Sequence, residues 1–284
     1  MTITLTAYAK VNLYLHVTGK RSNGYHELDS LIAFAQTGDV LTFEPADTLS
    51  LSITGEMAPY LDGGQDDNLV MRAAQGLQKL CKIEAGAKIT LDKRLPVAAG
   101  IGGGSGDAAT ALKGLCQLWN VFPDPVGMEE LALSLGADVP ICMKAHANHV
   151  AGIGEKITPL PPLPECWMVL VNPMVAVSTP AVFKARTGGF SPSSPMVGEY
   201  DLKGFYKGLA ERHNDLMAPA ITIAPQIQDV LVALEGQEEC RLARMSGSGA
   251  TCFALFDTER QAQQAQKGLK SAYPEWWISI GKII

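Results

Sequence analysis

The sequence predicts an α+β protein built from two domains. Its 284 residues are enough for about two domains of ordinary size. Apolar and polar residues alternate near the N-terminus, which indicates a strand, whereas apolar residues recur at helical spacing after a glycine-rich segment. The apolar content of 47% and the charged content of 18% are typical of a chain that folds around a core. Strands and helices are therefore both expected within a globular protein.

Charge and cysteine usage narrow the classes of protein to consider. The net charge of −6 and the isoelectric point near 5.4 argue against a nucleic-acid-binding surface but allow a small anionic ligand. The six cysteines are scattered and none forms a C-x-x-C pair, so we expect reduced thiols, not a zinc site or disulfide framework. No apolar run approaches the ~18 residues of a membrane helix, and Lys10 interrupts what would otherwise resemble a signal sequence. We expect a soluble, cytoplasmic protein that binds neither nucleic acid nor membrane.

The first expected element is a long strand over residues 2–17. Apolar and polar side chains alternate throughout this stretch, so one face is predicted to be buried. Lys10 and Asn12 project from the same polar face, two positions apart. The pattern alone favours an ordinary solvated strand face over a functional one.

A tight turn is expected after this strand. Asn23-Gly24, within residues 19–26, is typical of a β-hairpin. Tyr25 and His26 would then begin the returning strand. An aromatic ring beside an imidazole can stack on a nucleobase and hydrogen-bond to it. A core tyrosine and a surface histidine are the simpler interpretation of the same pair.

The other elements follow from side-chain period and from capping signals. Asp67 is predicted to cap a helix, and Thr258 with Gln261 to form a capping box for the last helix. Strands are expected at 40–44, 49–53, 88–92, 167–171, 251–256 and 277–280. Helices are expected at 69–80, 108–119, 128–135, 179–184, 202–211, 225–234 and 259–271. Residues 152–164 are rich in glycine and proline, which is typical of a domain junction.

The segment 96–110 is dense in glycine. Residues without a Cβ let the backbone turn tightly and bring several N–H groups to one ligand. Because a helix follows directly, the segment is expected to bind an anion at a helix N-terminus. A Walker A loop is excluded, since the chain contains no Gly-Lys-Ser or Gly-Lys-Thr triplet. A dinucleotide fingerprint, Gly104-x-Gly106-x-x-Ala109, lacks the strand that it requires directly before it, and a flexible surface loop is the remaining alternative.

Asp138 lies in a turn with two interpretations. The run Gly136-Ala-Asp138-Val-Pro140 is typical of a helix start, so Asp138 could be a structural cap. A carboxylate in an apolar turn could equally be a general base, and the pattern does not choose. His146 and His149 have no carboxylate or cysteine partner in their pattern and are not predicted to bind a metal.

Four segments in one order resemble a known family. They are 9–13, 96–109, 135–140 and a second glycine-serine turn at 246–250, and together they resemble the GHMP small-molecule kinases. The likeness implies a two-domain GHMP kinase fold with mixed and antiparallel sheets packed against helices. It also implies an N-terminal ATP-binding domain at residues 1–152 and a C-terminal domain at 153–284 that contributes to the substrate site. A further likeness at 23–28 points to members whose substrate is a polyol linked to cytidine diphosphate.

The resemblance implies ATP-dependent phosphorylation of the C2 hydroxyl of that polyol, in the non-mevalonate route to isoprenoid precursors. Lys10 and Asp138 match the catalytic pair: Asp138 would accept the hydroxyl proton, and Lys10 would keep Asp138 ionised. The positions that match the family's nucleotide site are Asn68, Lys93, Pro96, Gly100, Gly102, Gly103, Gly104, Ser105 and Gly106, with Ser105 also beside Mg²⁺. The positions that match its substrate site are Asn12, Tyr25, His26, Phe183, Gly247 and Ser248. Tyr25 and Phe183 would enclose the cytosine while His26 hydrogen-bonds to its edge.

Some features depart from the family pattern. Asp107 has the wrong charge for a phosphate contact, and we expect it to point away from the loop within the first helical turn, where the dipole favours it. The loop 187–195 matches nothing in the family. The alternatives are a sibling kinase for homoserine or mevalonate, a non-catalytic ligand sensor on the same fold and, more distantly, a dinucleotide-binding oxidoreductase. Retention of both Lys10 and Asp138 argues against the sensor. A monomer or weak homodimer is expected.

Overall fold

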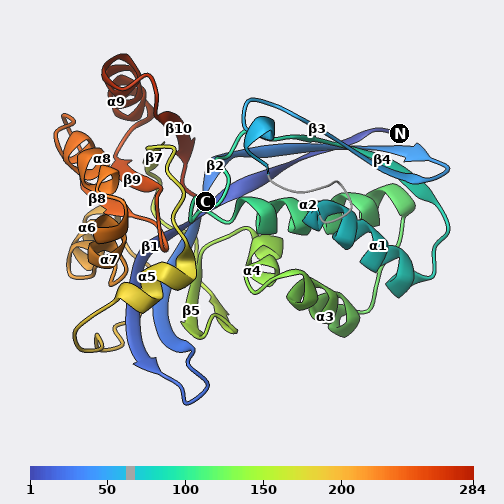
Figure 1. Ribbon diagram of the computed structural model, residues 1–284, viewed down its shortest axis with the longest axis horizontal. Coiled ribbons are helices and arrows are strands. Elements are labelled where there is room, and N and C mark those ends of the chain that lie inside the picture. The colour runs from blue at the N-terminus through green and yellow to red at the C-terminus, as the bar shows by residue number, and fades with distance from the viewer. Residues whose placement is uncertain (62–67) are drawn as a thin grey trace. The chain divides into compact units, whose positions relative to one another are not determined.

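Figure 1 shows a computed structural model of the chain, which describes residues 1–61 and 68–284. The chain divides into two compact units that are interleaved in sequence. Unit 1 contains residues 1–9, 38–97 and 102–144, and unit 2 contains residues 10–37, 98–101 and 145–284. Each unit combines strands with helices, so the predicted α+β class is confirmed. The domain assignment of 1–152 and 153–284 stays a prediction.

Unit 1 packs helices against a mixed set of strands. Strand β4 (Gly86–Asp92) runs parallel to β3 (Leu49–Thr54) and antiparallel to the second half of β2 (His26–Ala46). The helices are α1 (Leu69–Cys81), α2 (Gly103–Trp119), α3 (Pro125–Leu135) and α4 (Val139–Lys144), with a short 3₁₀ turn at Ala58–Tyr60. Figure 1 shows these four helices on one face of β3 and β4. The arrangement buries one apolar face of α1, formed by Val70, Met71, Ala73, Ala74 and Leu77.

Helix α1 begins at the predicted residue, Leu69, but its cap is another residue. Asn68 is the N-cap, and its Oδ1 accepts a hydrogen bond from Val70 N at 2.9 Å. The cap predicted at Asp67 lies outside the described residues. An asparagine amide satisfies the free N–H of the first turn as well as an aspartate does, so the two neighbours were equally good candidates by type.

Unit 2 contains the hairpin and a second sheet. β1 (Ile3–Lys20) ends before Arg21, whose N–H bonds to Tyr25 O at 2.7 Å, and β2 begins at His26, so the predicted hairpin is confirmed. The first half of β2 pairs antiparallel with β5 (Asn148–Gly152), which pairs with β6 (Lys156–Pro159). The second sheet has the antiparallel order β10 (Trp277–Lys282), β7 (Trp167–Asn172), β9 (Cys252–Phe256) and β8 (Leu242–Met245).

The helices of unit 2 supply the other half of its core. They are α5 (Thr179–Ala185), α6 (Leu202–Ala210), α7 (Met217–Ile223), α8 (Gln226–Glu235) and α9 (Glu259–Ala272). Figure 1 shows α6, α8 and α9 along one side of the second sheet. Apolar residues of α8 and α9 pack with residues of β7 and β9 in one buried cluster. The predicted capping box of Thr258 and Gln261 at the start of α9 is confirmed.

The burial of β1 overturns one expectation. The alternation holds only near its beginning, because every residue from Ala9 to Val17 is buried, including Lys10, Asn12 and His16. A solvated strand face is therefore the wrong interpretation. Part of the cause lies in unit 2, where Leu15 exchanges backbone hydrogen bonds with His213 and Asp215, so another segment lies along the edge of the strand.

Several elements were not expected from the sequence. β5, β6 and α7 are short, and a stretch of four to seven residues carries little periodic signal. β6 lies within the segment predicted as a domain junction. All six cysteines are free thiols, and Cys142, Cys166 and Cys252 are buried. Within residues 1–61 and 68–284, no helix is long and apolar enough to cross a bilayer.

Candidate functional site

The glycine-rich segment leads into an uncapped helix N-terminus in unit 1. Gly102, with φ of +68°, is the N-cap of α2 and offers no side chain to its first turn. The first bond of the ladder is Gly106 N to Gly102 O at 2.7 Å, so the N–H groups of residues 103–105 precede it and have no acceptor within the helix. Such donors, at the positive end of the helix dipole, can hold an anion. Strand β4 ends at Asp92, ten residues before α2, so the geometry of a dinucleotide fingerprint is absent.

A buried charge cluster lies beneath this first turn. Lys93 Nζ is 2.5 Å from Asp39 Oδ2 and 2.8 Å from Asp107 Oδ2, and all three side chains are nearly inaccessible. A Cβ on Gly103 would lie 3.1 Å from Lys93 Nζ, which places the ammonium directly against the start of α2. The other oxygen of Asp39 accepts hydrogen bonds from Arg94 N and Leu95 N. The cluster therefore fixes both the entry to the glycine segment and the helix that follows it.

The protonation of this cluster follows from its burial. Burial raises the pKa of Asp107 to about 8, with Lys93 opposing the shift and Asp39 reinforcing it. Burial favours the neutral amine of Lys93, yet the two carboxylates outweigh that effect and raise its pKa. The Lys93 ammonium and one proton retained on Asp107 thus balance the charge of the two carboxylates. The expectation that Asp107 lies in the first turn is wrong, because Asp107 is the fifth residue of α2, and its carboxylate turns to the buried Lys93.

The remaining predicted residues of unit 1 lie around the start of α2. Asn68 caps α1, and Leu69 Cδ1 would be 3.5 Å from a Cβ on Gly104, so the two helix starts are neighbours. A Cβ on Gly136 would be 3.9 Å from Ser105 Oγ. The turn before Asp138 therefore lies beside the hydroxyl of Ser105. Asp138 is half-buried and its carbonyl accepts a bond from Cys142 N at 3.1 Å, as at a helix start.

In unit 2, the residues 98–101 lie against the second glycine-serine turn. Ser246 Oγ accepts a bond from Asn12 N and donates one to Gly100 O, each at 3.1 Å. Lys10 N donates to Ile101 O at 3.0 Å, and a Cβ on Gly247 would be 3.1 Å from Gly100 O. Glycine at position 247, where φ is +55°, is therefore needed for conformation and for space. The structure brings Lys10, Asn12, Gly100 and Gly247 together.

The backbone and the buried side chains near these residues carry further detail. Ala98 adopts φ of +53°, a left-handed conformation that favours glycine, so the alanine is strained at this position. Pro96 is buried in unit 1. Asn12 Nδ2 donates to Ser30 Oγ at 2.8 Å, which orients the Asn12 amide.

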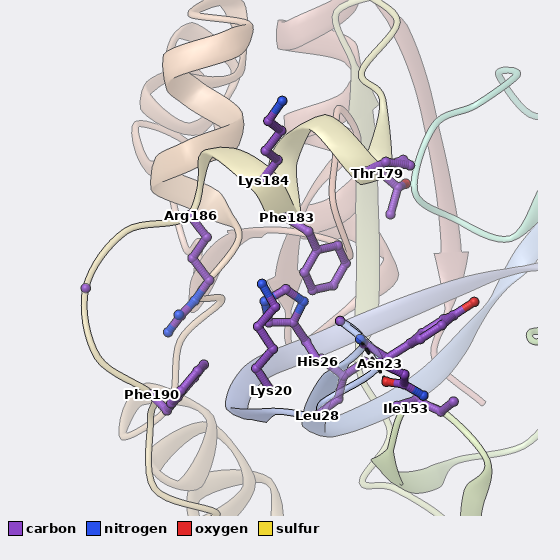
Figure 2. Close-up of a pocket in the computed structure, with 14 residues that line it drawn as sticks. Lys20, Asn23, His26, Leu28, Ile153, Thr179, Phe183, Lys184, Arg186 and Phe190 are labelled. Carbon is purple, nitrogen blue, oxygen red and sulfur yellow. Dashed lines mark hydrogen bonds between the residues drawn. The ribbon is translucent and has the colours of Figure 1, made fainter.

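Unit 2 also contains a cavity of about 800 Å³ (Figure 2). Tyr25, His26 and Phe183 all line it, and the rings of His26 and Phe183 are stacked with centroids 5.0 Å apart and planes at 23°. Ser248 Oγ is 2.7 Å from Thr179 Oγ1, which lines the same cavity, so the glycine-serine turn adjoins it. The predicted cytosine contacts thus share one cavity, although Phe183 already stacks on His26.

The lining of this cavity is basic. Lys20, Lys184 and Arg186 contribute to it, and none of its lining residues is acidic. Burial, and after it the charges of Lys20 and Arg186, lower the pKa of His26 below its ordinary value. The imidazole is therefore neutral at neutral pH and has one donor and one acceptor nitrogen. The sequence drew attention to none of these three cations, because isolated basic residues beside a turn or a helix end are common on any surface.

Comparison with known proteins assigns the family. The model of the GHMP kinases N terminal domain matches residues 68–146, and the model of the GHMP kinases C terminal domain matches residues 199–275. The chain belongs to the GHMP kinases.

Two relatives of this GHMP kinase carry the same name. A protein of Paramagnetospirillum magneticum named 4-diphosphocytidyl-2-C-methyl-D-erythritol kinase is 51% identical over 99% of this chain and 98% of its own length. One of Rhodospirillum rubrum with the same name is 49% identical over 98% of this chain and 91% of its own length.

Solved structures agree with the fold. A crystal structure of 4-(cytidine 5'-diphospho)-2C-methyl-D-erythritol kinase has a TM-score of 0.82 at 32% identity and covers 99% of each chain. Homoserine kinase from Cytophaga hutchinsonii, at 16% identity and a TM-score of 0.67 over 100% of this chain and 97% of its own, shares the fold. The expected GHMP kinase fold is confirmed.

Proposed function

We propose that this GHMP kinase transfers the γ-phosphoryl group of ATP to the C2 hydroxyl of 4-diphosphocytidyl-2-C-methyl-D-erythritol, in the non-mevalonate route to isoprenoid precursors. The observation that carries the proposal is the full-length likeness, near half identity, to relatives that bear this enzyme's name. The cavity of unit 2 supports it, since aromatic rings and basic side chains suit a nucleotide diphosphate. Homoserine and mevalonate contain no nucleobase, so a kinase for either alcohol would not need aromatic rings in this cavity for stacking.

The cytidyl end of the substrate is assigned to unit 2. Tyr25 and Phe183 offer ring faces to the cytosine, and stacking on such a face contributes ~1–3 kcal/mol per base. The neutral imidazole of His26 donates to or accepts from the edge of the base. Gly247 and Ser248 lie beside Thr179 of the cavity and are assigned to the diphosphate.

The reacting alcohol is assigned to Asn12, Lys10 and Asp138. Asn12, held by Ser30 and Ser246, would orient the polyol through its amide. A carboxylate oxygen of Asp138 would accept the proton of the C2 hydroxyl while the hydroxyl oxygen attacks the γ-phosphorus of ATP and ADP leaves. The Lys10 ammonium would stabilise the ionised carboxylate and the oxygen as it develops charge. These roles come from the match to the family.

The nucleotide is assigned to the glycine segment. The N–H groups of residues 103–105 and the backbone from Gly100 to Gly106 would bind the phosphates. Asn68 and Pro96 are proposed to line the nucleotide site. Lys93 is proposed to support that site by holding the start of α2 through its carboxylate pairs. A hard cation favours oxygen ligands, and the Ser105 hydroxyl in this first turn fits Mg²⁺ together with phosphate oxygens. Bound Mg²⁺ would neutralise phosphate charge.

A coupled ADP-release assay tests the proposal. The wild type is expected to turn over the cytidyl substrate and neither homoserine nor mevalonate. Asp138→Asn is expected to lower kcat by about 10²–10⁴, the usual contribution of a positioned general base. Asp229→Asn removes an exposed carboxylate of α8 in the same way and should leave the rate unchanged.

Two outcomes would contradict the proposal. Turnover of homoserine or mevalonate in place of the cytidyl substrate would assign a sibling kinase. Equal rates for Asp138→Asn and the wild type would remove Asp138 from the role of base. The expected cytoplasmic location and the expected monomer or weak homodimer stay predictions.

A further inference from the structure

The loop that matched no family pattern forms one end of the cavity in unit 2. We define the strap as residues 186–195, which follow α5. Arg186, Gly188 and Phe190 of the strap line the cavity. Figure 2 shows Arg186 and Phe190 together at one end of it, on the far side of Lys20 and His26 from Thr179. The strap is thus the wall opposite the glycine-serine turn.

Phe190 presents an aromatic face at this end. Its side chain is 52% exposed although it lines a cavity, and Tyr25, at 60%, is the other large exposed hydrophobic residue there. The guanidinium carbon of Arg186 lies 5.3 Å from the centre of the Phe190 ring. Arg186 is itself largely buried, with a side chain only 8% exposed. A rigid ring with a fixed cation beside it is a surface for a planar or anionic ligand.

Asp215 holds the first half of the strap. Its carboxylate accepts hydrogen bonds from Ser191 Oγ at 3.0 Å and from Val17 N at 2.7 Å. Its Oδ2 is 3.9 Å from Arg186 Nη2. Ser191 N also donates to Val17 O at 3.0 Å. One carboxylate therefore joins the strap to β1, the strand that leads into the hairpin of Tyr25.

Asp29 holds the second half in the same way. It is almost fully buried in β2 and accepts hydrogen bonds from Ser193 Oγ at 2.8 Å and Ser194 N at 2.5 Å. Tyr14 Oη donates to it at 2.7 Å, and His149 Nε2 lies 3.0 Å away. Burial opposes ionisation, yet these four partners outweigh it and hold the pKa of Asp29 well below its ordinary value. A charged carboxylate with four partners is a rigid anchor.

These contacts lead to one inference, which rests on the proposed function. We propose that Phe190 is a substrate-binding residue that contacts the cytidine part of the substrate. Arg186 completes the same wall, and Asp29 and Asp215 are positioning residues that hold the strap against the β1–β2 hairpin. Asp29 lies in β2, which begins at His26, and Asp215 is hydrogen-bonded to Val17 of β1, so the strap is attached to both strands of the hairpin. The strap would therefore select for the pyrimidine nucleotide and take no part in phosphoryl transfer.

Binding of cytidine 5′-diphosphate, measured by calorimetry, tests this without any turnover. Phe190→Ala is expected to raise the Kd of cytidine 5′-diphosphate about five-fold or more, because a stacking face is lost. Asp215→Asn is expected to raise this Kd about as much, because the strap that carries Phe190 is no longer held. Both should raise the KM for the cytidyl substrate by a similar factor and leave kcat and the KM for ATP within about two-fold. Phe122→Ala is the matched control, because Phe122 is 90% exposed and lies in unit 1.

The outcomes separate this inference from the proposed function. Failure of the wild type to phosphorylate the cytidyl substrate overturns the proposed function. Tight binding of cytidine 5′-diphosphate with an unchanged Kd in Phe190→Ala overturns the strap inference alone. A change in kcat without a change in KM also overturns it, because positioning of the cytidine would then not be the role. If Asp215→Asn fails to fold, the Kd of Phe190→Ala alone tests the strap inference, since a half-exposed ring can be removed without opening the core.

Discussion

At the scale of single residues, the cluster of Asp39, Lys93 and Asp107 shows how burial changes the protonation of ionisable side chains. Two carboxylates and one ammonium share a site that water does not reach, so one proton is retained to balance the charge. The cluster holds the backbone of Arg94 and Leu95 on one side and the second turn of α2 on the other. The glycines supply the free N–H groups, and these three side chains hold the helix that presents them.

Because Asp107 retains a proton in the folded protein, we expect the stability to depend on pH. The folded pKa of Asp107, about 8, lies above its unfolded value of 3.8, so the folded state binds the extra proton between these limits. This contribution to the unfolding free energy is complete below pH 4 and is lost as the pH rises through about 8. Asp107→Asn, which cannot ionise, should lack that decline. Urea unfolding at several pH values between about 5 and 8 measures it.

Asp229→Asn, an exposed carboxylate, is the control for this comparison and should keep the wild-type slope. An equal slope for wild type and Asp107→Asn would mean that Asp107 is ionised in the folded protein.

At the scale of elements, α2 packs against β2 through a position that has no room for a side chain. A Cβ on Gly114 would lie 2.2 Å from Phe43 Cε2, and the Phe43 ring is fully buried. Glycine costs stability within a helix, so its presence here reflects close packing. The packing determines the depth at which α2, and with it the first turn of the proposed phosphate site, lies in unit 1.

Gly114→Ala is therefore expected to destabilise the protein, although alanine is the better helix former. Forcing a methyl group into a filled core costs about 1–3 kcal/mol. Gln117→Ala changes an exposed position on the same helix to the same residue and should leave the unfolding free energy nearly unchanged. Chemical denaturation compares the two variants. Stabilisation by Gly114→Ala would show that helix propensity outweighs packing at this position.

At the scale of the whole molecule, the two compact units divide the proposed ligand contacts. Unit 1 contains Asn68, the first turn of α2 and Asp138, whereas unit 2 contains Lys10, Asn12 and the basic cavity. β1 and β2 each contribute residues to both units, so neither unit is a continuous piece of sequence. No single cut of the chain would therefore separate the two units, because each unit needs residues of β1 and β2.

This division predicts which amides each ligand protects. A ligand that binds the folded state suppresses local opening where it binds. Cytidine 5′-diphosphate should slow hydrogen exchange in the hairpin 21–25 and in α5, whereas a non-hydrolysable ATP analogue should slow it at the start of α2. Exchange followed by mass spectrometry on the full chain measures both. Protection of the start of α2 by the cytidyl ligand, with none in the hairpin, would contradict the assignment.

Features that depend on neighbouring residues were predictable. The density of glycine before α2, the Asn23-Gly24 turn and the capping box of Thr258 follow from backbone preference and local hydrogen bonding. The long helices were found because their apolar period repeats over several turns. The short β5, β6 and α7 were missed because too few residues carry the period.

The sequence by itself determined the fold class, most element positions, the glycine-rich segment before a helix and, through its motifs, the kinase family. Only the tertiary structure decided that the polar side of β1 is buried, that Lys93 pairs with Asp39 and Asp107, and that Asp29 and Asp215 hold the strap. Asp29 and Ser193 are 164 residues apart in the chain. Turns and caps depend on residues a few positions away, whereas burial, charge pairing and pKa depend on which distant segments the fold brings into contact.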